Sequence, residues 1–343
     1  MNRKIIFGII LILFTASFAY TQSQFEPEEN FTVRVIEGGT AIEVTKYNGR
    51  NTDVRIPPQI QNLPVTVIGK DAFFGNRLTS VVIPDSVTII RDSAFADNRL
   101  TSVVIPDNVT IIGRYAFLRN RLTSVVIPNN VTTIGKDAFS WNYLSSVVIP
   151  DSVTIIRDSA FFVNRLTSVV IPDSVTVIGK NAFSWNYLSS VIISDSVTTI
   201  MDSAFSVNRL TSVVIPDSVT VIGENAFSWN YLSSVVIPDS VTTIGRNAFF
   251  WNQLTSVIIS DSVTIIEEGA FSWNQLTSVI IPDSVSIIED NAFSRNRLTS
   301  IIIGANIKIA NNAFDQGFVE FYNYQGRRAG TYTLNGSWSV QFK

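Results

Sequence analysis

The chain has 343 residues, of which 46% are hydrophobic and 15% charged, and its net charge is −3. It contains neither cysteine nor histidine, which excludes disulfide bonds, metal sites built on Cys or His, and catalysis that needs either residue. A mildly acidic chain is also poorly suited to nucleic acid. We therefore expect an ordered protein without a nucleic-acid partner.

The first 19 residues have the pattern of a secretory signal peptide. A basic MNRK start precedes the apolar run IIFGIILILFTASFA, and Ser17 and Ala19 place small residues at a cleavage site. The run is short for a membrane span. We expect cleavage after Ala19 and a secreted or cell-surface protein with no membrane span left; an uncleaved membrane anchor is the alternative.

Residues 20–52 are expected to form a linker and a capping hairpin. The stretch from Phe31 to Lys46 reads FTVRVIEGGTAIEVTK. Two alternating runs flank Glu-Gly-Gly, which is typical of two strands joined by a tight turn.

Residues 53–317 are dominated by an internal repeat, which predicts a solenoid. An Ala-Phe pair recurs every 22 residues, and it places Phe73, Phe95, Phe117, Phe139, Phe161, Phe183, Phe205, Phe227, Phe249, Phe271 and Phe293 in register. A shortened copy ends at Phe314. One unit cannot bury enough apolar surface to fold alone, so about twelve coils are expected to stack on one another.

Each unit contains two short β-branched runs separated by turns. In the copy LTSVVIPDSVTIIRDSAFADNR, from Leu78 to Arg99, Pro84 ends the first run because it lacks the donor that a parallel ladder needs. No stretch has helical periodicity over ten residues. We therefore predict a mainly β fold with parallel strands and this inward set: Leu78, Val81, Ile83, Val87, Ile90 and Phe95.

Two polar columns run through the repeat. Asn recurs from Asn76 to Asn296 and is interpreted as a buried ladder that satisfies backbone groups. Asp recurs in a turn from Asp85 onward, but each coil supplies one carboxylate and Asn129 interrupts the row. Calcium needs six or more oxygens, so neither a metal site nor a cofactor is predicted.

Residues 318–343 are expected to form a C-terminal capping hairpin. Thr331 to Phe342 reads TYTLNGSWSVQF, and Asn335-Gly336 between alternating residues is a strong hairpin signal. Hairpins at both ends would cover sheet edges that otherwise invite aggregation.

One candidate binding surface is the outward side of the first strand. Alternation turns the residue between the two buried ones outward, and this position is β-branched throughout. Its central members form the stripe Val148, Val170, Ile192, Val214, Val236 and Ile258. A stripe of this size indicates a partner site, whereas strand propensity alone also accounts for β-branched residues there.

The second candidate surface consists of aromatic residues on either side of the Asn ladder. It comprises Trp141, Tyr143, Trp185, Tyr187, Trp229, Tyr231, Trp251 and Trp273. Trp and Tyr are preferred anchors of protein interfaces. The competing interpretation is packing between coils, because Arg165 and Arg209 alternate with the tyrosines and would each lie between two rings.

The pattern L-x-x-V-x-I-P-x-S-V-x-x-I-G-x-x-A-F, at Leu166 to Phe183, resembles the BspA-type leucine-rich repeats of bacterial surface proteins. The resemblance extends over about residues 53 to 317. The usual unit of that family has one more residue and carries Cys where this chain has the ladder Asn. The resemblance implies an exported or surface-exposed protein, often adhesive, that binds host matrix proteins or other bacteria without catalysis.

No unique catalytic constellation interrupts the repeat, so we do not expect an enzyme. The sequence predicts an exported binding scaffold, an adhesin that contacts an extracellular or host protein, or a glycan, through one face of the repeat. The alternative is a structural protein of the cell envelope that self-associates through the β-branched stripe and has no specific ligand.

Overall fold

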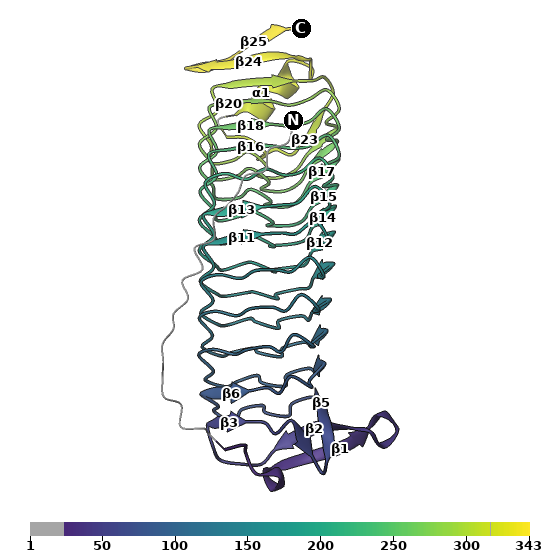
Figure 1. Cartoon of the computed structure of the whole chain (residues 1–343). Helices are drawn as coiled ribbons and strands as arrows, with labels where there is room; N and C mark the ends of the chain where they lie inside the picture. Colours follow the sequence, from purple (N-terminus) through teal and green to yellow (C-terminus); the bar gives the residue numbers. More distant parts are fainter. Residues whose placement is uncertain (1–23, 316) are drawn as a thin grey trace, which may run out of the picture.

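The protein is described by a computed structural model, which covers residues 24–315 and 317–343 and shows a β-solenoid of stacked coils (Figure 1). The predicted signal peptide lies outside these residues. Within the described part of the chain, no helix is long and apolar enough to cross a membrane.

One face of the solenoid is a single 15-stranded sheet built mainly from the second strand of each coil. It contains β1 (Phe31–Ile36), β2 (Ala41–Tyr47), β4 (Gln59–Ile60), β5 (Leu63–Ile68), β7 (Ile89–Ile90), β8 (Ile111–Ile112), β9 (Thr133–Ile134), β10 (Ile155–Ile156), β12 (Val177–Ile178), β14 (Thr199–Ile200), β15 (Val221–Ile222), β17 (Thr243–Ile244), β19 (Ile265–Ile266), β21 (Ile287–Ile288) and β23 (Lys308–Ile309). From β5 onward the main ladder is parallel, with one coil as the step between partners.

The first strands form a second face, where pairing is interrupted. Its strands are β3 (Asp53–Arg55), β6 (Ser80–Val82), β11 (Ser168–Val170), β13 (Ser190–Ile192), β16 (Ser234–Val236), β18 (Ser256–Ile258), β20 (Ser278–Ile280) and β22 (Ser300–Ile303). They pair as β3–β6, β11–β13, β16–β18 and β20–β22, and isolated bridges join Val104 to Val126 and Val126 to Val148. The first face therefore holds the coils together more evenly than the second.

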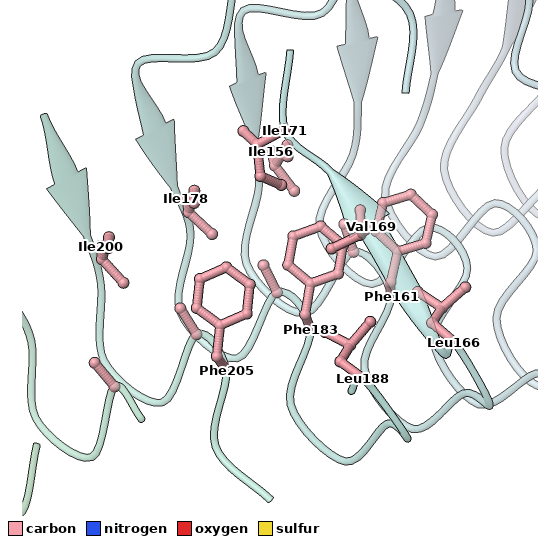
Figure 2. Close-up of a cluster of buried hydrophobic side chains, with 14 of the residues drawn as sticks. Ile156, Phe161, Leu166, Val169, Ile171, Ile178, Phe183, Leu188, Ile200 and Phe205 are labelled. Carbon is pink, nitrogen blue, oxygen red and sulfur yellow. The ribbon is translucent and has the colours of Figure 1, made fainter. Parts of the chain in front are cut away.

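The core is a column of identical side chains from successive coils. Figure 2 shows Phe161, Phe183 and Phe205 in one row inside the solenoid, beside Leu166 and Leu188. Neighbouring rings along this column, from Phe73 to Phe314, are stacked with centroids 4.9–5.7 Å apart. The predicted inward set of the first full unit is buried, as predicted. Each coil alone would expose this apolar surface, so stacking is what stabilises it.

Antiparallel hairpins cap both ends, as predicted. At the N-terminus, β1 and β2 are joined through the 3-10 turn η2 (Glu37–Gly39), and β2 also pairs with β5. Another 3-10 turn, η1 (Glu28–Asn30), precedes β1. At the C-terminus, β24 (Gly330–Asn335) pairs with β22 and with β25 (Ser337–Phe342). The N-terminal hairpin thus extends the continuous sheet, and the C-terminal hairpin extends the interrupted one.

One element of the C-terminal cap was not predicted. The helix α1 (Phe318–Tyr324) precedes the hairpin and buries Phe318, Val319 and Tyr322. Phe318 meets Phe314, the last ring of the core column, edge-on at 4.9 Å. Seven residues are too few for a helical period to be recognised in the sequence, and packing against the end of the column stabilises them.

Candidate functional site

The third side of each coil is a turn held by the Asn ladder. In one coil, Asn186 Nδ2 donates to the carbonyl of Phe183, at 3.1 Å, and to that of Phe161 in the preceding coil, at 2.9 Å. Its Oδ1 accepts from the backbone N–H of Leu166, at 3.0 Å. The same pattern recurs from Asn98 to Asn296, which confirms the interpretation of this column as a structural ladder.

This turn forces two residues of each coil into the left-handed backbone region. The inner position lies two residues before Phe and is filled mostly by residues that tolerate this region, such as Asn181, Asn225 and Gly269. The outer position immediately precedes the ladder Asn. It holds Gly75, Asp97, Arg119, Trp141, Val163, Trp185, Val207, Trp229, Trp251, Trp273 and Arg295, with φ between 50° and 68°.

The predicted aromatic residues lie together on this side of the solenoid. We call the eight of them, from Trp141 to Trp273, the aromatic surface. The five tryptophans are 40–57% exposed, and Tyr143, Tyr187 and Tyr231 are 44–49% exposed. The outer position points its side chain away from the core while the next residue, the ladder Asn, is buried. Sequence spacing therefore placed all eight residues on one accessible face.

The C-terminal part of the aromatic surface is continuous. Trp229 stacks on Trp251 with centroids 4.5 Å apart, and Trp251 stacks on Trp273 at 4.6 Å. Phe250 meets Trp229 edge-on at 6.0 Å. These contacts contribute about 0.5–1.5 kcal/mol per pair, so part of this surface also serves packing between coils.

The N-terminal part of the aromatic surface is built differently. The guanidinium of Arg165 lies 4.3 Å from the ring centroid of Tyr143, and that of Arg209 lies 4.4 Å from that of Tyr187. Each arginine thus contacts the ring of the coil before it. The predicted ladder, with each arginine between two rings, is replaced by separate Arg–Tyr pairs among the described residues.

The β-branched stripe is also exposed, as predicted. Its members, Val148, Val170, Ile192, Val214, Val236 and Ile258, are 56–81% exposed. A shallow groove of about 580 Å³ follows the stripe from Val148 to Ile192. It opens where the isolated bridges end at Val148 and the next strand pair begins with β11.

A basic groove at the N-terminal end of the Asn side had not been singled out from the sequence. It holds about 660 Å³ and is lined by four arginines together with Trp141 and Tyr143. The signal was available, because Arg77, Arg99 and Arg121 occupy the same column in three successive units. No group of three or more acidic side chains able to hold a metal ion occurs in the residues described.

The fold and these columns define a leucine-rich-repeat solenoid. The family model of the BspA type leucine rich repeat region, which spans six copies, matches overlapping segments that together extend over residues 50–318. The chain therefore belongs to the family of BspA-type leucine-rich-repeat proteins.

Solved structures with the same fold come from several bacteria. A leucine rich cell surface protein from Faecalibacterium prausnitzii is 28% identical, with a TM-score of 0.54, over 87% of this chain and 96% of that one. A leucine-rich repeat protein from Bacteroides ovatus is 23% identical, with a TM-score of 0.59, over 86% and 95%. The pneumococcal vaccine antigen PcpA is 21% identical, with a TM-score of 0.60, over 81% and 80%. No curated protein matches the chain.

Proposed function

We propose that the protein is an exported, non-enzymatic scaffold that binds another protein through its aromatic surface. The observation that carries this proposal is the residue choice at the outer left-handed position. Bulky side chains at positive φ cost of order 1–3 kcal/mol of backbone strain each. Asn or Gly would avoid most of this cost, yet five coils carry exposed tryptophans.

The composition of the surface fits a protein partner. Trp, Tyr and Arg are the residues most enriched among interface hot spots, and this side of the solenoid supplies all three. The stacked tryptophans present a broad apolar face, and the Arg–Tyr pairs present charge beside it. The F. prausnitzii relative is described as a cell surface protein, and the predicted signal peptide agrees with such a location, which supports adhesion as the role of this contact.

The proposal is tested by screening residues 20–343 against a panel of purified extracellular-matrix proteins and then replacing Trp229, Trp251 and Trp273 together with Asn. Asparagine is chosen because it tolerates the left-handed backbone. Affinity for a partner found in the screen should fall at least roughly tenfold. The matched control replaces Val126, Val148 and Val214 with Thr on the other face, and it should leave affinity unchanged. Equal affinity of both variants would contradict the proposal.

The β-branched stripe supports a second candidate function, self-association of the chain in the cell envelope. The exposed row and its groove form a contiguous apolar patch of the kind that marks an interface, and a second copy offers an identical row for an isologous contact. Sedimentation at increasing concentration should then show dimers that Val148→Lys abolishes. A monomer at every concentration would dismiss this candidate.

A further inference from the structure

The structure points to a second binding site at the N-terminal end of the solenoid, and we propose that it binds a linear acidic polysaccharide. The site is the basic groove, formed by Arg77, Arg99, Arg119 and Arg121 with Trp141 and Tyr143 at one end. It shares Trp141 and Tyr143 with the aromatic surface, but it does not include the stacked residues Trp229, Trp251 and Trp273, on which the protein-binding role is tested.

Three of these arginines form a row of like charges. Arg77, Arg99 and Arg121 occupy one position in successive coils, whose core rings Phe73 and Phe95 lie 5.0 Å apart. All three side chains are exposed, and within the described chain none of them forms an ion pair. These arginines lie in the turns of neighbouring coils, where like charges repel one another, so the row is not explained by the stability of the free protein.

The same column shows how the repeat otherwise avoids this repulsion. From Tyr143 to Tyr231, tyrosine alternates with arginine, and Arg165 and Arg209 lie over tyrosine rings. Gln253 and Gln275 follow in the same column. In the basic groove, the one acidic lining residue is Asp97, whose Oδ1 lies 3.8 Å from Nη1 of Arg119. The groove therefore keeps a positive charge that an anionic ligand would neutralise.

The shape and chemistry of the groove favour an acidic sugar chain. The arginines run along the solenoid axis, which suits a linear polymer with repeated carboxylates or sulfates. Trp141 and Tyr143 are about half exposed at the end of the row, with Arg165 over one face of the Tyr143 ring, and each has an apolar ring with a polar edge.

A nucleic acid fits these observations less well. Proteins that bind nucleic acid strongly neutralise about 6–10 phosphates, whereas this row extends over only three coils of an acidic chain. Aromatic rings in single-strand sites form a platform for successive bases, whereas here the rings stand at one end of the row.

Titration calorimetry with five probes tests the proposal. The probes are a heparin decasaccharide, a hyaluronan decasaccharide, a neutral maltodextrin, a ten-nucleotide poly-dT and polyglutamate. We expect binding of one or both acidic sugars, with affinity that falls as salt rises, and no binding of maltodextrin. Heparin binding alone would identify sulfate as the recognised group, and hyaluronan binding would show that carboxylate suffices. Tighter binding of poly-dT or polyglutamate, or binding of neither acidic sugar, would overturn the proposal.

Variants locate the site. Replacing Arg77, Arg99 and Arg121 together with Gln should weaken sugar binding at least roughly tenfold. The matched control replaces Arg209 and Arg297, from the same column, and the nearby Arg295 with Gln, and it should change affinity less than roughly twofold. Replacement of the first three arginines with Lys keeps the charge and should retain most of the binding. This variant keeps the test decisive even if the Gln variant folds poorly. Equal loss in the test and control variants would refute the site.

Discussion

Each coil has two left-handed positions four residues apart, and the chain treats them differently. The inner position, which precedes the buried Phe by two residues, holds mainly Asp, Ser, Asn and Gly, the residues that tolerate or locally stabilise positive φ. The outer position has the same backbone conformation but holds Trp, Val and Arg in most coils. The backbone therefore dictates the residue at the inner position, whereas something other than the backbone has selected the residue at the outer one.

Duplication explains the order of the outer residues but not their identity. The segments AFSWNYLSSV at Ala138, Ala182 and Ala226 are identical and 44 residues apart, so a two-coil unit has been copied. Trp251 and Trp273 follow with the alternation gone. Their presence in consecutive coils makes the continuous stack and is the part of the pattern that copying a two-coil unit does not produce.

The largest expected effect comes from breaking the turn that creates both positions. Asn186→Ala would leave the buried N–H of Leu166 without its partner and would remove one of the two amide donors to the carbonyl of Phe161, since Asn164 also donates to that oxygen. One unsatisfied buried N–H costs about 1–3 kcal/mol, so the free energy of unfolding should fall by about 1–3 kcal/mol in urea titration. A loss below about 1 kcal/mol would mean that water replaces the side chain, and the ladder would then not be what fixes the turn.

The next largest effect is expected in the tryptophan stack. Trp251 contacts a ring on each side, so Trp251→Asn should remove two stacking contacts and lower the free energy of unfolding by about 1–3 kcal/mol. Chemical denaturation measures this directly. Part of the loss will be offset because Asn tolerates the left-handed backbone better. Unchanged stability would show that the stack contributes nothing to packing between coils.

A smaller effect of opposite sign is expected at Val163. This β-branched residue sits at the outer position with φ of 51°, where valine is strongly disfavoured. Val163→Asn should therefore raise the free energy of unfolding by about 1 kcal/mol. Thermal unfolding of the variant beside the parent protein measures the change, and a lower midpoint would show that the valine side chain is held by contacts stronger than the backbone strain.

The smallest effect concerns the charge at one inner position. Burial raises the pKa of the Asp137 carboxyl above its ordinary value. The folded state then binds a proton more readily than the unfolded state, so ionised Asp137 costs stability at pH 7, and this cost disappears as the pH falls through the folded pKa. Asp137→Asn should be slightly more stable than the parent at pH 7 and equal to it at low pH. Unfolding curves at both pH values measure the difference in stability between the variant and the parent. A variant less stable than the parent at pH 7 would contradict the prediction.

The repeat made much of this fold predictable. The spacing of Phe73 to Phe293, the stop at Pro84 and the alternation around Val82 placed the strands, the core and both exposed rows. Two features of the backbone escaped prediction, in addition to the basic groove. The helix Phe318–Tyr324 depends on tertiary packing against the end of the core column, which a short segment does not reveal. The left-handed backbone at Trp185 follows from the inward turn of Asn186. Tryptophan rarely adopts positive φ, so its sequence position did not predict this conformation.

We expect an exposed tryptophan outside the stack of Trp229, Trp251 and Trp273 to serve contact with a partner and not the fold. Trp185 isolates this claim, since no aromatic ring stacks on it among the residues that the structure describes. Trp185→Asn loses some buried apolar area, worth about 1 kcal/mol, and gains a similar amount from relief of backbone strain. The free energy of unfolding, measured by urea titration, should therefore change by less than about 1 kcal/mol. A loss above about 2 kcal/mol would show that the tryptophan is held for packing and would contradict the account.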